Sequence, residues 1–443
     1  MNSIRLFLLS LALALVVKAQ QPPPRLPACA FPCIEALAGG RMATTSTARA
    51  LVAPDVCLAS RDPSASLQIQ TQIQNCLLQQ CSPAESLETV RAVADLCSWP
   101  VRSRKASLLA LFAIQIPAVL CLGLRLYDRI ARAARYAVDD YLIMAVAPLF
   151  VTFLAVGQYG SVVAFGVDVW TVPDGTIAAA MQAFYVDEML YLAILALVRL
   201  SILFLYLRLF APQPPAAASL REPHRRSTSD ASAPSTSTSL SMSPPSTPPE
   251  TPTTASARQR YRTVYYYRFR AAVLVIAAIL VVLPTVVVFF LDIFQCHPVR
   301  TVWTRWTSAS PVSSLVEETT CLDVRALAYV AASFGIVQDV AILLVPWPLL
   351  FVLRHSLFPS VRSVTALTAL AMFSLGIFVL ITSCVRLHFL VHFNPTTTTN
   401  PTWDNTDSLI WSGLEVSVSV IVACLPAVRA MVQAAYRNRR GTL

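Results

Sequence analysis

Residues 184–210 of the chain read FYVDEMLYLAILALVRLSILFLYLRLF. Most of these residues are apolar, and a helix of about 20 such residues is long enough to cross the hydrocarbon layer of a membrane. The stretch also contains Asp187, Glu188 and Arg199. Ionisable side chains inside a span are costly and are therefore candidates for function. The stretch predicts a membrane-spanning helix that carries buried ionisable groups.

Further apolar stretches of this kind predict seven spanning helices in all. The expected spans are residues 106–126, 141–160, 183–207, 270–291, 324–352, 364–385 and 407–428. The composition agrees, because 56% of the 443 residues are hydrophobic and only 13% are charged, whereas soluble domains contain roughly one quarter charged residues. The mean hydropathy is +0.60.

The region before the first span is predicted to be secreted. Residues 1–19 contain Arg5, an apolar run, and small residues at Val17 and Ala19, which is typical of a cleaved signal peptide. Six of the eleven cysteines follow within the first hundred residues: Cys29, Cys33, Cys57, Cys76, Cys81 and Cys97. An even number of cysteines after a signal peptide predicts a disulfide framework. The pairing stays open, since six cysteines allow about fifteen connectivities.

A helix is expected to begin at Ser82, because Ser82-Pro83-Ala84-Glu85 is a capping-box pattern with proline at the first helical position. The preceding residues 67–80 fit both a strand alternation and a helical face. We favour a helix, since its buried face would include Cys76. The predicted fold class is an all-α membrane protein, with a small disulfide-rich helical domain at 20–105 followed by a bundle of seven transmembrane helices.

Arginines predict the orientation of the bundle, because cytoplasmic loops carry an excess of positive charge. With the N-terminal domain outside, the inner loops and the tail contain these arginines: Arg129, Arg132, Arg135, Arg208, Arg221, Arg225, Arg226, Arg258, Arg260, Arg262, Arg268, Arg270, Arg354, Arg362, Arg437, Arg439 and Arg440. The outer loops are poorer, with Arg300, Arg305 and Arg386. Arg102, Arg104 and Lys105 oppose this assignment, because they lie on the outer side of the first span.

The remaining division of the chain follows from composition. Spans 1–3 occupy residues 106–210 and spans 4–7 occupy residues 258–431, with a cytoplasmic tail at 432–443. Between them, residues 211–257 are rich in Ser, Thr, Pro and Ala, and such a segment is predicted to be disordered. The net charge of +10 comes from residues that flank the spans, so we do not expect nucleic-acid binding.

Two sets of residues outside the N-terminal domain are candidates for a structural or functional role. Cys296 and Cys321 share the predicted outer loop between spans 4 and 5 and are expected to form a disulfide. Asp187, Glu188 and Glu415 lie in outer halves of their helices and could line an outward-facing ligand pocket. Asp339 and Arg199 could form a switchable polar link between helices. Static pairing is the alternative for these ionisable residues.

The N-terminal strings LPACAFPCIEAL (26–37), IQNCLLQQCSPAESL (73–87) and LCSWP (96–100) resemble the CFEM domain of fungal extracellular membrane proteins. That family normally has eight cysteines, and this domain has six. The resemblance implies a possible haem or iron ligand at Asp55, which precedes Cys57. A membrane-tethered haem-binding protein is therefore the alternative function.

The strings RLYDRI (125–130), VDDYLIM (138–144) and FQCHPV (294–299) resemble the CFEM-bearing, rhodopsin-like seven-helix receptors of filamentous fungi, of the appressorium and host-sensing type. This resemblance implies a plasma-membrane sensor of extracellular, surface or host cues that signals through heterotrimeric G proteins. The expected partners are membrane lipid, an unknown extracellular ligand and a G protein.

Enzymatic and retinal-based chemistry are not expected. A retinal Schiff base needs a buried lysine, but the two lysines, Lys18 and Lys105, lie outside the predicted spans. The five histidines form no HExxH motif, so neither a metal site nor a catalytic site is predicted. Apart from the possible haem, no cofactor is expected.

Overall fold

The computed structural model describes residues 26–37, 72, 76–77, 79–97, 99–131, 136–173, 175–209, 252–304, 306, 320–345, 363–392 and 400–441. The predicted signal peptide, Asp55, Cys57 and residues 211–251 of the predicted disordered loop lie outside these ranges, so the predictions for them are untested. Within the described ranges the chain is almost entirely helical.

Seven helical rods in the described residues are long and apolar enough to cross a membrane, which confirms the predicted number. They are α7 (Lys105–Ala131), α8 (Val138–Val163), α9 (Thr176–Leu209), the continuous rod of α10 (Pro252–Val275), η3 (Ile276–Val282) and α11 (Leu283–Ile293), then α14 (Val324–Leu344), α16 (Ser363–His392) and α18 (Thr406–Gly441). The fold class is therefore a seven-helix membrane protein.

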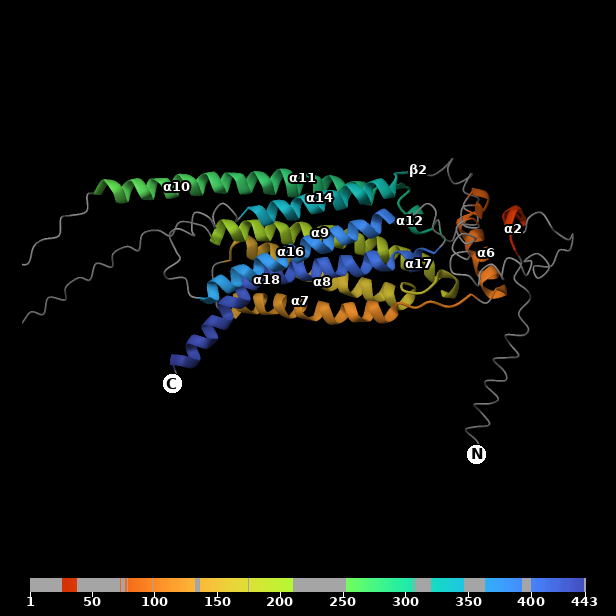
Figure 1. The fold of residues 1–443 in the computed structure, drawn as a ribbon, viewed down its shortest axis with the longest axis horizontal. Helices are drawn as coiled ribbons and strands as arrows, with labels where there is room; N and C mark the ends of the chain where they lie inside the picture. The colour runs from red at the N-terminus through yellow and green to blue at the C-terminus, as the bar shows by residue number, and fades with distance from the viewer. Residues whose placement is uncertain are drawn as a thin grey trace, which may run out of the picture.

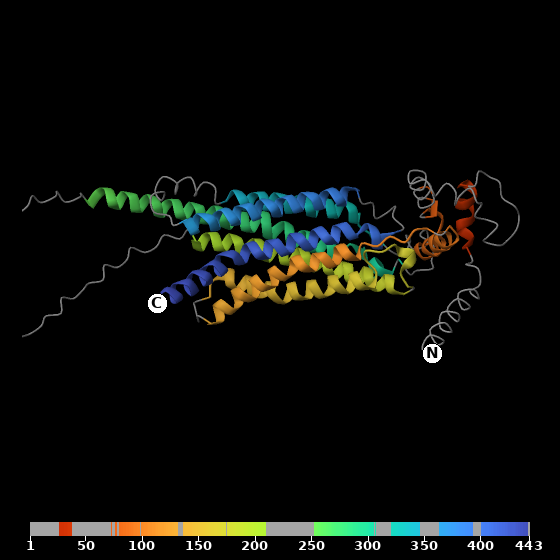
Figure 2. The ribbon, with the colours of Figure 1, turned by 60° about the horizontal axis from the view of Figure 1, so that its bottom comes forward.

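The rods lie side by side in one elongated bundle (Figure 1 and Figure 2). The N-terminal disulfide region lies at one end of the bundle, which we call the head end, and the C-terminus lies at the opposite end, the tail end (Figure 1). At the tail end α10 extends past the other helices, and the last turns of α18 diverge from the bundle (Figure 1).

Helices α9 and α18 form the centre of the bundle. Within the apolar stretch of each helix, 50% of the residues of α9 and 61% of those of α18 are buried, against 17–28% in the other five rods. Helix α8 packs on α9, and α7 and α16 pack on α18. The core between them includes Phe150 of α8, Ile194 and Leu203 of α9, and Val416 and Val420 of α18. Side chains of α9 and α18 are thus the ones best placed to meet inside the bundle.

The outer surface of the bundle is apolar. Large hydrophobic side chains such as Leu109, Leu120, Ile279, Val286 and Ile381 are exposed, whereas many charged side chains are buried. A surface of this kind is suited to lipid and would be unfavourable in water. The distribution supports the assignment of a multi-pass membrane protein.

The π-helical segment η3 has an identifiable cause. Pro284 stands at the start of α11 and has no backbone N–H to donate to the preceding turn. Just before this proline the helix widens to a π-helical turn, in which the backbone N–H of Leu283 donates to the carbonyl of Ala278, five residues earlier. Wider turns of this type are found mostly as short insertions in α-helices.

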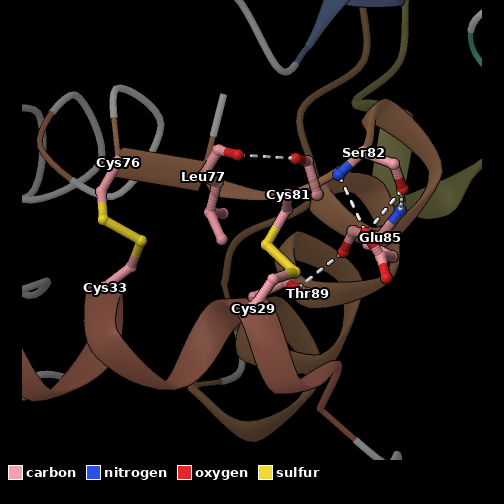
Figure 3. Close-up of a disulfide and its surroundings, with 9 residues drawn as sticks. Cys29, Cys33, Cys76, Leu77, Cys81, Ser82, Glu85 and Thr89 are labelled. Atoms are coloured by element: carbon pink, nitrogen blue, oxygen red, sulfur yellow. Dashed lines mark hydrogen bonds between the residues drawn. A yellow bond between two sulfur atoms is a disulfide. The ribbon is translucent and has the colours of Figure 1, made fainter. Parts of the chain in front are cut away.

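The head region consists of η1 (Ala28–Ala30), α2 (Phe31–Leu37) and α6 (Pro83–Leu96). Two disulfides, Cys29–Cys81 and Cys33–Cys76, join the η1–α2 segment to the residues before α6 (Figure 3). Cys97 is also disulfide-bonded. Within 67–80, the described residues Gln72, Cys76, Leu77 and 79–80 are helical, in agreement with the helix that we favoured there.

The capping box that predicts the start of α6 is present. The Ser82 hydroxyl accepts the backbone N–H of Glu85 at 3.2 Å, and the Glu85 carboxylate accepts the backbone N–H of Ser82 at 2.9 Å (Figure 3). Both interactions satisfy N–H groups that the helix itself leaves unpaired. The start of this helix is therefore determined locally.

The head region packs directly on the head end of the bundle. Leu87 of α6 joins an apolar cluster with Leu108 and Phe165, and the ring of Trp99 meets that of Trp170 edge-on at 5.3 Å between centroids. Trp170 belongs to η2 (Val169–Thr171), in the connection between α8 and α9. The two parts of the protein share a hydrophobic interface.

Arg102 and Arg104, which oppose the charge bias in the sequence, have structural partners at this interface. Arg102 donates to the buried Asp168 through Nη2 at 2.6 Å, and its guanidinium lies 4.3 Å from the ring centroid of Trp403 in α17 (Pro401–Asp404). Arg104 pairs with Asp407 at 2.7 Å. These cations therefore join the segment before α7 to two other segments of the head end.

Substitution of Asp168 tests the contact between the segment before α7 and the rest of the head end. Its carboxylate is fully buried and accepts from the Arg102 side chain, the Arg102 backbone N–H at 3.0 Å and Asn400 Nδ2 at 2.8 Å. We expect Asp168→Ala to lower the free energy of unfolding by about 2–3 kcal/mol, because it leaves buried donors without an acceptor. Asp407→Ala, which removes a partly exposed pair, should cost less than about 1 kcal/mol. Thermal unfolding of the purified protein measures both, and equal losses would contradict the expectation.

Two sequence predictions about the helices need correction. Helix α10 begins at Pro252, so residues 252–257 are helical although we predicted them to be disordered. Proline is tolerated in a first helical turn, and the Ala and Arg residues that follow favour a helix. The sixth span, predicted at 364–385, was also ended too early, because α16 continues to His392. Arg386 therefore lies inside a span and not in an outer loop.

Candidate functional site

A cavity lies between the helices near the head end. Its volume is about 120 Å³, which is room for several water molecules or a small ligand. Aromatic side chains in its wall are Phe184, Tyr185, Tyr191, Tyr329 and Trp306. The charged side chains in its wall are Asp187, Glu188, Arg325 and Arg386.

The connection between α11 and α14 forms one side of this cavity. Strands β1 (Cys296–His297) and β2 (Thr320–Cys321) pair antiparallel, and the predicted disulfide joins Cys296 to Cys321. The short helix α12 (Thr301–Thr304) follows β1, and its Trp303 ring lies 5.8 Å from that of Tyr185. Because Cys296 lines the cavity, the disulfide holds part of the cavity wall in place.

A polar network begins in the floor of the cavity, at Arg386. The guanidinium of Arg386 lies over the ring of Tyr191, 4.2 Å from its centroid, and Nη1 donates to the Tyr191 hydroxyl at 2.8 Å. The same hydroxyl donates to Glu415 Oε2 at 2.8 Å. Arg386 and Tyr191 line both the cavity and a smaller space of about 30 Å³ beneath it, so they form the boundary between the two.

Arg199 and Asp339 form the lower part of the network. Arg199 donates to both carboxylate oxygens of Asp339, from Nε at 2.9 Å and from Nη2 at 3.0 Å, and Nη1 donates to Gln338 at 2.8 Å. A two-pronged contact of this kind is the strongest geometry for an arginine–carboxylate pair. Gly335 of α14 lies beside the guanidinium, and a Cβ there would be in ordinary contact with Nη2, at 3.6 Å.

Ser383 connects the two halves of the network. Its hydroxyl lies 2.9 Å from Asp339 Oδ2 and 2.8 Å from Glu415 Oε1, and Glu415 also lies 3.7 Å from Arg199 Nη2. Arg199, Arg386, Asp339 and Glu415 supply two positive and two negative formal charges, so the network is balanced. It joins α9, α14, α16 and α18 in the middle of the bundle.

A second charged cluster lies at the tail end. The buried Arg125 of α7 pairs with Asp139 at 2.9 Å and with Asp140 at 3.2 Å, both at the start of α8. It also donates to the backbone carbonyl of Ala423 in α18. Arg208, in the last turn of α9, lies 3.5 Å from Asp139 and 3.4 Å from Asp140. This cluster joins the two central helices, α9 and α18, to α7 and α8.

Helix α9 carries members of all three features. Asp187 and Glu188 lie in the cavity wall, Tyr191 and Arg199 lie in the network, and Arg208 lies in the tail-end cluster. A shift of α9 would therefore alter all three at once. Helix α9 therefore provides a physical connection between the cavity at the head end and the charged cluster at the tail end.

The sequence placed several of these residues well. Asp187 and Glu188 line the cavity, and Arg199 contacts Asp339, as the predicted pocket and polar link require; what these residues do functionally remains a prediction. Glu415 is almost completely buried and belongs to the network instead of the cavity wall. Asp55 lies outside the described residues, so haem binding is untested.

Other members of these features were missed. Arg386 was assigned to a loop because the sixth span was predicted to end at residue 385, whereas α16 continues to His392. Arg125, Asp139, Asp140 and Arg208 were treated only as family motifs or loop charges. A signal for them exists in the sequence, because ionisable residues at the ends of apolar runs are candidates for pairing, but it does not reveal the partners.

The seven-helix arrangement agrees with the comparison to known families. The family model described as the fungal rhodopsin domain matches residues 124–219 and 256–434. The chain belongs to the fungal rhodopsin domain family. The match begins in α7 and ends in α18, so it includes the network and the tail-end cluster but not the head region. The resemblance of the head region to a CFEM domain therefore stays a prediction.

Two further comparisons give no match. No curated protein and no solved structure matches this chain significantly. Functional conclusions for this fungal rhodopsin domain protein therefore rest on its own residues.

Proposed function

We propose that this fungal rhodopsin domain protein is a receptor-like sensor of the plasma membrane and not an enzyme. In this proposal the head end faces the outside, where a cue, such as an extracellular ligand or a host or surface signal, reaches the cavity. The tail end and the C-terminus face the cytoplasm, where a heterotrimeric G protein reads the arrangement of the helices.

The single observation that carries this proposal is the position of the balanced network. It lies directly below the cavity and includes Tyr191 and Arg199 of α9, the helix that ends in the tail-end cluster. Buried ion pairs are sensitive to small displacements, because an uncompensated charge in the interior is costly. A ligand that moves Arg386 or Tyr191 would change the pairing below and, through α9, the contacts of Arg208. Coupling between two sites requires an element with two arrangements. In this proposal that element is the network together with α9.

The tail-end cluster gives a direct test of signalling. We expect Arg208→Gln to raise basal nucleotide exchange on a co-expressed fungal Gα subunit about threefold, because it releases α9 from Asp139 and Asp140 and so favours the shifted state. The matched control is Arg270→Gln, which removes an exposed arginine of α10 and should leave exchange unchanged. Membranes that contain the wild type, either variant or no receptor are compared for guanine-nucleotide uptake. If no Gα subunit of the host responds to either the wild type or Arg208→Gln, the G-protein proposal is wrong.

The orientation needs its own measurement. A protease-cleavable tag is fused after Leu443, and a second tag is inserted after Pro27 in the head region. On intact cells, protease should remove the head tag and leave the C-terminal tag. Cleavage of the C-terminal tag alone would overturn the proposed topology and, with it, the sensor function.

A further inference from the structure

Asp187 separates two cavities. One is the head-end cavity described above, and the other is a small space of about 30 Å³ on the opposite side, lined by Gln115, Gly157, Gln158, Ser161 and Asp187 among others. Leu409 also lines both spaces, so they adjoin at Asp187 and Leu409. A group bound in the larger cavity therefore lies beside the same carboxylate that faces the smaller space.

Two hydrogen-bond acceptors in the small space are unsatisfied. Asp187 Oδ1 and Gln115 Oε1 are completely shielded and have no hydrogen-bond partner in the described part of the chain, and each of the two residues is only 6% exposed. The backbone leaves the space beside the carboxylate open, because residue 157 is glycine; a Cβ there would lie 3.5 Å from Asp187 Oδ1. Buried acceptors without donors are unfavourable, so the site is suited to a group that brings N–H or O–H bonds.

The charge balance points to a cation. Arg199 and Arg386 are matched by Asp339 and Glu415 in the network, and Arg325, the other arginine of the cavity wall, forms no ion pair with Asp187 within the described residues. Glu188 adds a second carboxylate to the wall. An isolated buried carboxylate is costly unless a positive group pairs with it.

The shape and lining of the larger cavity describe the rest of the ligand. Apart from Asp187, Glu188, Arg325 and Arg386, its wall is largely apolar and aromatic, with Phe184, Tyr185, Tyr329, Leu390 and Leu409. Apolar surface buried against such side chains stabilises a complex, and aromatic faces also attract organic cations. An inorganic ion would leave this part of the cavity without a partner.

We propose that the cavity binds a small organic amine, whose ammonium group donates to Asp187 Oδ1 and Gln115 Oε1 and whose apolar body lies against Phe184, Tyr185 and Tyr329. This inference rests on the proposed sensor function and names the chemical class of its ligand. Asp187 is the residue that selects for positive charge.

Thermal unfolding of the full-length protein in nanodiscs tests the proposal with defined probes. The cations are propylamine, hexylamine and 2-phenylethylamine. Propanol, hexanol and 2-phenylethanol are their neutral counterparts, and phenylacetate is an anion of similar size. We expect at least one amine to raise the unfolding temperature in a saturable manner, with a smaller shift from its alcohol and none from phenylacetate.

Variants locate the effect. Asp187→Asn should raise the half-saturating concentration of that amine at least tenfold, and Gln115→Leu should raise it about threefold. Asp95→Asn is the matched control, since it removes an exposed carboxylate in the head region and should change nothing. Gln115→Leu keeps the test informative if Asp187→Asn fails to fold, because it removes one acceptor and no charge.

The outcomes separate this proposal from the function on which it rests. If no amine stabilises the wild type more than its alcohol does, or if both variants respond as the wild type does, the cavity holds water only or Asp187 is protonated, and the ligand class is wrong. Increased nucleotide exchange in Arg208→Gln would still support the sensor in that case. Saturable amine binding without any G-protein response would support the ligand class and contradict the proposed signalling through a G protein.

Discussion

Replacing Arg199 by leucine is expected to lower the free energy of unfolding by about 3–5 kcal/mol, the usual cost of removing one partner from a buried ion pair. The variant leaves Asp339 and Glu415 close to the same Ser383 hydroxyl without the guanidinium that lies between them. Two carboxylates so placed repel each other in a region from which water is largely excluded. Asp339→Leu should cost less, because Arg199 keeps Gln338 and Glu415 as partners.

A double-mutant cycle measures the pair itself. Arg199→Leu/Asp339→Leu should be more stable than Arg199→Leu alone, since it removes one of the two unpaired carboxylates. Equilibrium unfolding in mixed micelles gives the four free energies, and Arg270→Leu is the control for loss of an exposed arginine. If the losses of the two single variants simply add, Arg199 and Asp339 do not interact as the structure describes.

Arg125→Met is the second substitution with a large expected effect. Arg125 is only 2% exposed and holds Asp139, Asp140 and the carbonyl of Ala423. Without it, the remaining cationic partners of the two buried aspartates are Arg129 and Arg208, which lie nearer the surface. We expect a loss of about 3–5 kcal/mol in unfolding free energy. Arg125→Lys should recover only part of it, because an ammonium cannot reproduce the planar fork that reaches several oxygens.

Arg129→Met provides the matched control. Arg129 lies one turn further along α7 and pairs with Asp140 at 3.0 Å, but its side chain is 18% exposed. Its loss should cost less than the loss of Arg125, because Asp140 keeps Arg125 as a buried partner. Thermal unfolding of the three purified variants checks these values. Equal stability of Arg125→Met and Arg129→Met would mean that burial does not govern the strength of this cluster.

The two clusters also explain why the interior of the bundle is polar and its surface apolar. Lipid provides no driving force for apolar side chains to meet, so interhelical hydrogen bonds and close packing contribute more to helix association. The network and the tail-end cluster supply such bonds between six of the seven rods. Their loss should therefore affect both the stability of the bundle and any signal that passes through α9.

The sequence alone determined the features that depend on neighbouring residues. Runs of apolar residues specify the seven spans, Ser82 and Glu85 specify the start of α6, and two cysteines in one short connection specify the Cys296–Cys321 bond. Each of these depends on local hydrophobicity, local hydrogen bonding or a short chain separation, so no knowledge of the packing is needed.

Tertiary structure alone decided which charges meet. Arg386 faces Tyr191 because α16 extends further than its apolar run suggests, and Arg125 meets Asp139 and Asp140 because α7 and α8 turn these faces toward each other. The pairing of Cys29 with Cys81 and of Cys33 with Cys76 was likewise open until the helices were placed. The depth of a helix in the bundle and its rotation about its own axis are set by packing against several neighbours. The hydropathy of the sequence does not determine either of them.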